Sequence, residues 1–351
     1  MGITIEAILT EAMKAGASDV HVTVGIPPKM RVDGSLVAMS YPRLAPSDTL
    51  AMLISIMSEA QREIFEERGE YDMAFAVREV GRFRVNAYKQ RGSVAMAIRL
   101  VSGDVPSVEE LGIPGSVADL YQKKQGLVLV TGPAGCGKSA TMAALIDRIN
   151  TLREVHIITL EDPMEYQHRH KLSMVNQREI GLDCPDYVSA LESALREDPD
   201  VILVGEMRDL ETIGAVITAA ETGHLVLASL HTSGVVNSVE RMVDLFPTYR
   251  QQQIRIRLAN VLEAVISQQL LPTSEGNGRV AAFEVLHVTR KIRALIREGA
   301  MGQLPAAMEA GRKLGMMTMD EAIGTLLEAG TITKETAVWF AQQPEYMNGR
   351  I

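Results

Sequence analysis

The sequence of 351 residues predicts an α/β protein with two domains. In its second part, short continuous apolar runs alternate with stretches of helical periodicity, which is typical of a parallel sheet covered by helices on both faces. In its first part, three strands carry apolar residues at every second position, which predicts a sheet with one buried face. Hydrophobic residues make up 46% of the chain, enough for packed cores.

Residues 1–100 are expected to form the first domain. A helix is predicted around residues 5–12, followed by extended segments at 21–24, 29–32 and 35–39, with a hairpin turn at Asp33-Gly34. Ser47 is predicted to cap a single helix that reaches Phe65. The buried stripe expected on this helix consists of Leu50, Leu53, Ile54, Met57, Ile64 and Phe65.

The three alternating strands lie within residues 71–77, 83–85 and 94–100. Because their apolar side chains share one face, the opposite face carries Arg82, Arg84 and Arg99. Residues 101–118 contain two prolines and three glycines around a short acidic piece, and they predict an interdomain linker.

The second domain is expected to span residues 119–351. Its continuous apolar strands are predicted at 127–130, 155–160, 201–204 and 225–228. Helical stripes lie between them, one of which consists of Met142, Leu145, Ile146 and Ile149. After Pro247 the chain is predicted to be mostly helical, with Ile254, Leu258, Val261, Leu262 and Val265 in register.

The strongest functional signal fits the P-loop pattern G-x-x-x-x-G-K-[ST], after a predicted strand and before an amphipathic helix. In such a loop, backbone N–H groups surround phosphate oxygens, the lysine reaches the β and γ phosphates, and the hydroxyl ligates Mg²⁺. We therefore predict ATP and Mg²⁺ as cofactors. The predicted nucleotide-binding residues are Gly132, Pro133, Ala134, Gly135, Cys136, Gly137, Lys138, Ser139 and Ala140.

Two acidic segments follow predicted strands. Glu206 stands where a Walker B acid belongs and is the predicted general base, unless it is an ordinary solvated glutamate at a strand end. Glu161 and Glu165 are predicted to hold Mg²⁺ through water, together with Ser139; the alternative is a polar loop.

Histidines and arginines complete the candidate set. His224 and His231 bracket one predicted strand and point to opposite sides of it, so we expect no shared metal. Either they are structural, or His231 senses the γ phosphate, with His224 a second sensor candidate. The predicted catalytic residues are Glu206, Lys138, Glu161 and His231. The three arginines form a solvated face or approach the ATP of a neighbouring copy.

The net charge and the number of cysteines exclude some classes of function. A net charge of −9 argues against bulk binding of nucleic acid, and the two cysteines are too few for a four-cysteine zinc site. No apolar run reaches the roughly 18 residues of a membrane-spanning helix, and the N-terminus lacks the basic region of a signal peptide. We expect a cytoplasmic chain without direct membrane insertion and without a nucleic-acid partner.

The motifs resemble the type IV pilus retraction ATPases of the secretion ATPase superfamily over nearly the whole chain. The similar segments are residues 17–28, 81–86, 90–93 and 267–272, together with those around Glu161, Glu206 and His231. Residues 291–298 are similar to the AIRNLIRE motif of the retraction branch, with Lys291 for Ala and Ala294 for Asn. The P-loop also differs from the pattern of this family, because Ala134 and Ala140 stand where Thr is common.

The resemblance implies a PAS-like N-terminal domain and a RecA-like P-loop NTPase domain with a helical C-terminal part. It implies a homo-hexamer with ATP between subunits, in which Arg82, Arg84 and Arg99 help to close the site. The expected function is an ATPase motor for pilus retraction (pilin disassembly, twitching motility). The expected partners are the pilus machinery and its inner-membrane platform protein, at the inner face of the cytoplasmic membrane.

Three rival functions stay open at this point. They are a pilus extension or accessory ATPase of the same superfamily, a nucleic-acid motor, and a nucleotide sensor that does not hydrolyse ATP.

Overall fold

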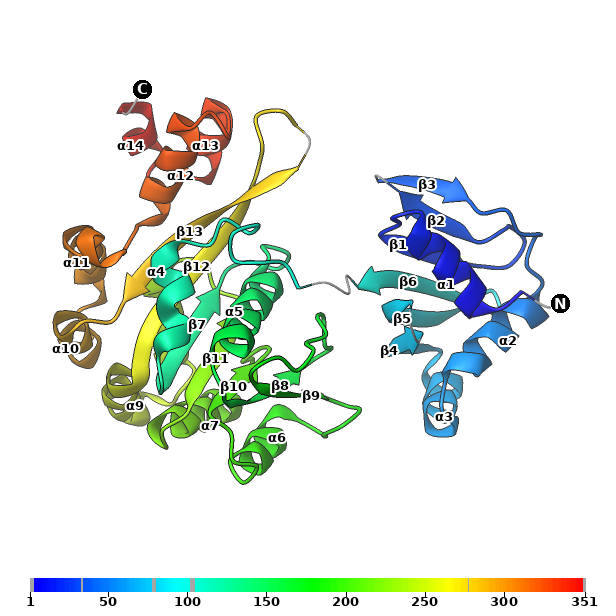
Figure 1. Cartoon of the computed structure of the whole chain (residues 1–351), viewed down its shortest axis with the longest axis horizontal. Coiled ribbons are helices and arrows are strands. Elements are labelled where there is room, and N and C mark those ends of the chain that lie inside the picture. Colours follow the sequence, from blue (N-terminus) through cyan, green and yellow to red (C-terminus); the bar gives the residue numbers. More distant parts are fainter. Residues whose placement is uncertain (1–2, 33, 78–79, 102–104, 277, 350–351) are drawn as a thin grey trace. The chain divides into compact units, whose positions relative to one another are not determined.

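The computed structural model describes residues 3–32, 34–77, 80–101, 105–276 and 278–349. The chain divides into two units, Met1–Asp104 and Val105–Ile351, and each has its own sheet and core (Figure 1). The predicted α/β fold class is confirmed.

The first unit contains a six-stranded sheet among the described residues, in the order β3-β2-β1-β6-β5-β4 with antiparallel neighbours. Its apolar face packs against three helices in one core. The first strand lies two residues earlier than predicted, and Asp33 of the predicted turn is outside the described residues. The elements are α1 (Ile5–Lys14), β1 (Asp19–Val22), β2 (Lys29–Val32), β3 (Ser35–Ala38), α2 (Pro46–Ile56), α3 (Glu59–Arg68), β4 (Glu70–Val77), β5 (Gly81–Gln90) and β6 (Ser93–Val101).

The prediction of a single helix capped by Ser47 is wrong. Helix α2 starts at Pro46, where the side chain of Asp48 accepts the backbone N–H of Ala45 at 2.7 Å. The chain turns extended after α2, and Ser58 then caps α3. The buried stripe of α2 is also rotated by about one position, because Thr49, Met52 and Leu53 fill the side toward the core, while Leu50 and Ile54 are exposed.

The predicted arginine face is present on β5 and β6. Arg84 lies directly opposite Arg99, and Arg82 lies opposite Val101 in the same register. Arg99 is 70% exposed and its Nε donates to Oδ1 of Asp19 at 3.1 Å. The period of two therefore places these side chains on one face of the sheet, as predicted.

The segment predicted as a linker is shorter in the structure. Residues 102–104 lie outside the described residues, whereas residues from Val105 on belong to the second unit. Val108, Ile113 and Val117 are buried in the core of that unit. The apolar residues among the prolines and glycines thus anchor the segment to the sheet rather than leaving it as a connection.

The second unit contains a seven-stranded sheet among the described residues, in the order β13-β12-β7-β11-β10-β8-β9. All neighbours are parallel except β12 and β13. The four predicted apolar strands are confirmed. The strands are β7 (Gly126–Thr131), β8 (His156–Glu161), β9 (Met174–Glu179), β10 (Val201–Val204), β11 (Leu225–Leu230), β12 (Leu262–Pro272) and β13 (Arg279–His287).

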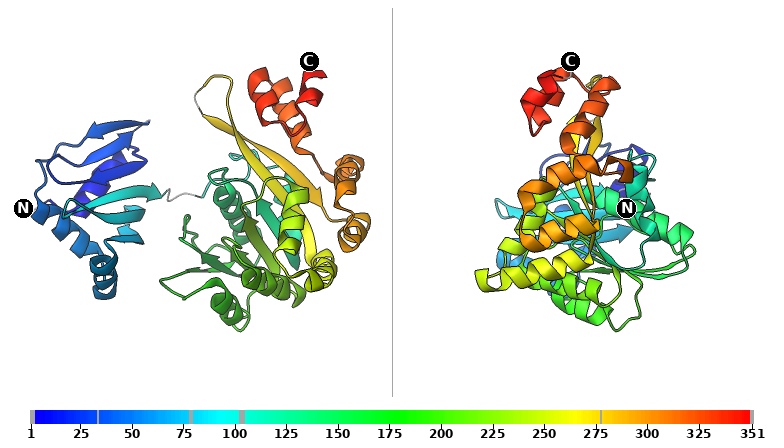
Figure 2. Two further views of the ribbon diagram at one scale, coloured as in Figure 1. Left: turned by 180° about the vertical axis from the view of Figure 1, so that it is seen from behind. Right: turned by 90° about the vertical axis from the view of Figure 1, so that its left-hand side faces the viewer.

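Helices cover both faces of this sheet (Figures 1 and 2). One face packs against α6 (Tyr187–Ala194), α7 (Leu210–Glu221), α8 (Val235–Asp244), α9 (Thr248–Val261) and α10 (Arg290–Glu298). The other packs against α4 (Gly115–Ala118), the short helix η1 (Asp119–Gln122) and α5 (Lys138–Leu152). Every residue of the predicted 142–149 stripe is buried.

The prediction of helix across residues 254–265 is wrong over its last four residues. Helix α9 ends at Val261, and Leu262 begins β12 without a turn between them. The nearly continuous apolar run from Leu262 to Ile266, interrupted only by Glu263, also fits a buried strand, and the segment forms a strand because it pairs with β7 on one side and β13 on the other.

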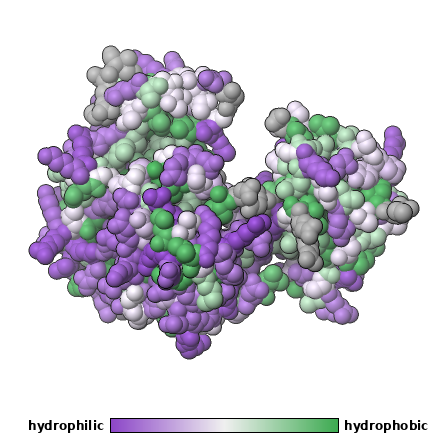
Figure 3. All heavy atoms as spheres, in the orientation of Figure 1, coloured by the Kyte–Doolittle hydropathy of each residue, from purple (hydrophilic) through white to green (hydrophobic). Residues whose placement is uncertain are grey.

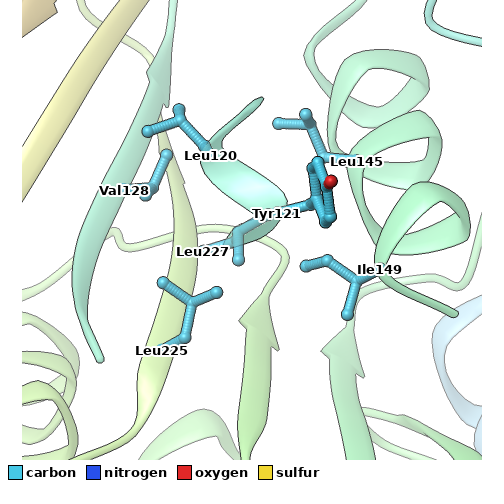
Figure 4. Close-up of a pocket in the computed structure, with 7 residues that line it drawn as sticks. All are labelled: Leu120, Tyr121, Val128, Leu145, Ile149, Leu225 and Leu227. Atoms are coloured by element: carbon cyan, nitrogen blue, oxygen red, sulfur yellow. The ribbon is translucent and has the colours of Figure 1, made fainter. Parts of the chain in front are cut away.

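A small apolar cavity lies between the sheet and α5 (Figure 4). The ring of Tyr121 from η1 lies beside Leu145 and Ile149 of α5, opposite Leu225 and Leu227 of β11. This lining cannot neutralise phosphate charge, so the cavity is a packing feature rather than a nucleotide site.

The C-terminal part is helical, as predicted, after the β12–β13 hairpin. It consists of α10, α11 (Leu304–Ala310), α12 (Met319–Glu328), α13 (Lys334–Phe340) and α14 (Pro344–Gly349). Leu271 of β12 joins a separate core with Met319 and Ile323 of α12. Asp320 accepts the backbone N–H groups of Gln342 and Gln343 at 2.7 and 2.9 Å, which fixes the end of α13 to α12.

A buried carboxylate lies between this part and the main sheet. Glu284 on β13 is 6% exposed, and its Oε2 accepts the backbone N–H of Val235 at the start of α8. Burial, with the charge of Asp320 nearby, raises the pKa of Glu284 to about 7.

The charged form of Glu284 is therefore expected to weaken the fold. Its folded pKa is above the unfolded value, so the stability it contributes is complete below about pH 4.5 and is lost as the pH rises through 7. In the native chain, Glu284 should lower the free energy of unfolding by on the order of 3 kcal/mol between pH 5 and pH 8, and we expect Glu284→Gln to abolish this decrease. Urea unfolding at both pH values measures it, with the exposed Glu309→Gln as a control. If the free energy of unfolding of Glu284→Gln changes with pH as much as that of the native chain, Glu284 does not have a raised pKa.

Candidate nucleotide site at the carboxyl ends of the sheet

The predicted P-loop connects β7 to α5, at the edge of the sheet where β7, β8, β10 and β11 end. Gly137 has φ 93°, a left-handed conformation that favours glycine. A Cβ at Gly132 would collide with the backbone oxygen of Gln268 and would lie 2.6 Å from Sγ of Cys136. The two glycines thus allow the chain to turn tightly against β12, which presents loop N–H groups at the start of α5.

Lys138 closes this loop in the structure. Its side chain is buried, and Nζ donates to the backbone oxygens of Gly132 and Pro133, both at 2.9 Å. Nζ also lies 3.2 Å from Nδ1 of His231. Burial lowers the pKa of Lys138, since the ammonium is taken out of water without a carboxylate in direct contact. Phosphate oxygens are stronger partners for this ammonium than the loop carbonyls.

Glu206, His231 and Lys138 form one hydrogen-bonded chain. Because an ammonium only donates, Nδ1 of His231 accepts from Lys138, and the ring hydrogen is on Nε2. Nε2 then donates to Oε1 of Glu206 at 3.0 Å. The other oxygen, Oε2, accepts from Arg208 at 2.9 Å. The carboxylate predicted as the base is thus joined to the phosphate-binding lysine through the predicted sensor histidine.

Glu161 lies at the end of β8, the strand next to β10. Its Oε1 accepts Oγ1 of Thr159 at 2.7 Å and Nε2 of Gln177 at 3.2 Å. Burial raises the pKa of Glu161 in spite of these hydrogen bonds. Glu165 is exposed in the loop that follows, and Ser139 lies in the first turn of α5.

The structure separates some predicted site residues from this arrangement. His224 precedes β11, at the opposite end of that strand from His231. Its Nδ1 lies 2.9 Å from the backbone oxygen of Ala219 and 3.1 Å from Oγ1 of Thr222, so it joins the end of α7 to the strand. The arginines Arg82, Arg84 and Arg99 are in the first unit and are described there.

Gln268 on β12 is a site residue that the sequence pattern does not predict on physical grounds. It is 3% exposed, its Nε2 donates to the backbone oxygen of Cys136 at 2.7 Å, and its Oε1 accepts Oγ1 of Thr141 at 2.8 Å. It therefore fixes both the loop and the first turns of α5 to the sheet. The only signal in the sequence was the family-like segment 267–272, which does not say what this side chain does.

We expect Gln268→Leu to weaken ATP binding. The change keeps the volume but leaves a buried carbonyl and a buried hydroxyl unpaired at a cost of about 1–3 kcal/mol, which corresponds to an affinity weaker by roughly 5- to 150-fold if the loop must be re-formed to bind ATP. Gln269→Leu, one position along the same strand, is the matched control. Nucleotide titration measures both variants, and equal affinity in the two would contradict this role of Gln268.

The comparisons with known proteins begin with a family model. The model of the type II/IV secretion system proteins matches residues 2–336. The chain belongs to this family. The predicted membership of the secretion ATPases is therefore confirmed.

Two curated relatives of this family come from Pseudomonas aeruginosa. The chain is 45% identical over 341 residues to the type IV pilus retraction ATPase PilT, with 97% of this chain and 99% of that protein covered. It is 40% identical over 333 residues to the type IV pilus ATPase PilU, with 95% and 87% covered.

A solved structure supports the same family relationship. A crystal structure of the pilus retraction motor PilT with bound ADP matches with a TM-score of 0.93 and 47% identity, and 99% of both chains is covered. The predicted fold, a PAS-like α/β unit followed by a RecA-like unit with a helical C-terminal part, is confirmed for this secretion-family chain.

Proposed function

We propose that this protein is an ATPase motor that hydrolyses ATP to drive retraction of type IV pili, the disassembly of pilin subunits that underlies twitching motility. The observation that carries the proposal is the chain of hydrogen bonds from Lys138 through His231 to Glu206, at the mouth of a P-loop. The similarity to PilT over 97% of the chain supports the biological process.

The hydrolytic step follows from the contacts of these side chains. When ATP enters the loop, Lys138 exchanges the carbonyls of Gly132 and Pro133 for phosphate oxygens, and its bond to His231 is lost. His231 then turns from Lys138 to the γ phosphate, and Glu206 becomes available to accept a proton from water. Binding of ATP at Lys138 thereby changes the hydrogen bonds of His231, and through His231 those of Glu206, the proposed general base.

The residues present fit Mg²⁺, which keeps much of its water shell and takes few protein ligands. Among the described residues, no cluster of three His, Cys, Asp or Glu side chains could hold a metal ion unaided. Ser139 would ligate the ion beside the phosphates, and Glu161 and Glu165 would hold its water molecules. The ion supplies charge neutralisation on the phosphate oxygens.

We also propose that six copies assemble into a ring with ATP between subunits. The arginine face formed by Arg82, Arg84 and Arg99 supports this, because it offers a neighbouring copy three cations in addition to Lys138 and Arg208 of the site itself. Hydrolysis would shift the two units of each subunit, and the ring would act on the inner-membrane platform protein of the pilus from the cytoplasmic side. No helix in the described part of the chain has the length and apolar character needed to cross a bilayer, and the face of the second unit in Figure 3 is mostly hydrophilic.

Two experiments test the proposal. Phosphate release from ATP, measured against protein concentration, should give a specific activity that rises as subunits assemble; a flat specific activity would contradict shared sites. A deletion strain should carry excess pili and fail to twitch. Bald cells would instead mean pilus extension, and normal pilus number with weak retraction would mean an accessory ATPase.

A further inference from the structure

The hydroxyl of Tyr187 is a buried polar group that the site described above does not use. Tyr187 is the first residue of α6, next to Asp186, whose side chain caps this helix by accepting the N–H of Ser189. The ring packs against the larger core of the second unit. Its oxygen is buried and has no hydrogen-bond partner among the described residues. A phenylalanine would fill the same space without this cost, so packing alone does not account for the hydroxyl.

This hydroxyl lies between the ends of β8 and β10. A Cβ placed on Gly205 would lie 3.1 Å from the Tyr187 hydroxyl and 3.3 Å from Cα of Glu161. Gly205 immediately precedes Glu206, so the hydroxyl is beside the two strand ends that carry the catalytic carboxylates. Burial, followed by the charges of Asp162, Glu206 and Glu161, raises the pKa of Tyr187. The phenol therefore stays protonated at neutral pH, and its oxygen is free to accept a hydrogen bond.

Tyr187 also lines an open pocket of about 340 Å³. Asp162, Arg208 and Asp209 also line it, and Arg208 donates to Glu206. Its volume holds several water molecules, which the charged side chains among its otherwise largely apolar lining can bind. The pocket thus places Tyr187 beside Arg208, the side chain that contacts the Glu206 carboxylate.

We propose that Tyr187 positions the attacking water for Glu206, an inference that rests on the proposed ATPase function. In the step, the water oxygen bonds to the γ phosphorus as the bond from that phosphorus to the β–γ bridging oxygen breaks, and ADP leaves with the electron pair. One hydrogen of the water passes as a proton to Glu206. The other is held by the Tyr187 oxygen, which aims the lone pair of the water at phosphorus. Tyr187 itself neither gains nor loses a proton.

Tyr187→Phe in the full chain tests the inference, because it removes one oxygen and leaves the ring. We expect kcat to fall about tenfold with KM for ATP unchanged, since a single hydrogen bond to the reacting water is lost. We expect an equal or higher melting temperature, because an unpaired buried hydroxyl is removed. Tyr249→Phe, at a tyrosine 78% exposed on α9, is the control and should change nothing.

The outcomes separate this inference from the proposed function. If the native chain hydrolyses ATP and Tyr187→Phe has the same kcat, the inference is wrong and the ATPase function stands. A fall in kcat accompanied by a matching fall in melting temperature or ATP affinity would mean a structural role and would also overturn it. A native chain that does not hydrolyse ATP overturns the proposed function, and this inference with it.

Discussion

Replacing Glu206 by Gln is expected to lower kcat for ATP hydrolysis by about 10²- to 10⁴-fold, the usual contribution of a general base. The amide keeps the shape of the side chain and an oxygen to accept from His231 or Arg208, but it cannot take a proton from water. Because Glu206 does not contact the loop that binds phosphate, ATP affinity should stay close to that of the native chain. Phosphate release and nucleotide titration measure the two quantities.

The control for this variant is Glu192→Gln, at an exposed glutamate of α6 away from the site. It should hydrolyse ATP at the native rate. A Glu206→Gln chain with native kcat would mean that another group takes the proton, and Glu161 on the neighbouring strand would be the next carboxylate to test.

Replacing Lys138 by Met is expected to weaken ATP binding by about 10²-fold, as one charge-assisted contact to phosphate is lost. Met keeps the aliphatic stem, which is buried, and removes the ammonium. The loop also loses the two bonds from Nζ to Gly132 and Pro133, so the unliganded protein should melt at a lower temperature.

Lys124→Met, at an exposed lysine just before β7, is the matched control for charge removal. It should bind ATP as the native chain does. Native ATP affinity in Lys138→Met would contradict the P-loop assignment itself, since no other described residue of the loop carries a positive charge.

The parts of the site that were predictable are those whose geometry is local in sequence. The P-loop is eight consecutive residues between a strand and a helix, so its shape follows from its own glycines. Glu206 and His231 are predictable because each lies within two residues of the end of a continuous apolar strand, and neighbouring parallel strands end at one edge of the sheet. Their mutual contact then needs only the order of β10 and β11 in the sheet.

What could not be predicted depends on pairing over long distances. The spacing of apolar residues from Ile254 to Val265 fits both a helix and a buried strand. Only pairing with β7 and β13 shows that the chain changes from helix to strand at Leu262. Gln268 is 132 residues from the carbonyl it holds, and nothing near it in sequence indicates that contact. The break between α2 and α3 was missed because apolar residues continue on both sides of it, although Ser58 with Gln61 three residues later is a capping pair.

Strand β12 has a consequence for how the protein transmits motion. At Gln268 it holds the nucleotide loop, and three residues later Leu271 is part of the core of α12. β7 pairs with β12 as far as Ser267, and β13 pairs with it as far as Pro272, so the segment from Gln268 to Leu271 is held in extended form by β13. The nucleotide loop and the C-terminal helices are therefore joined by four residues of one strand, so a change in the position of the loop has a short, direct path to α12.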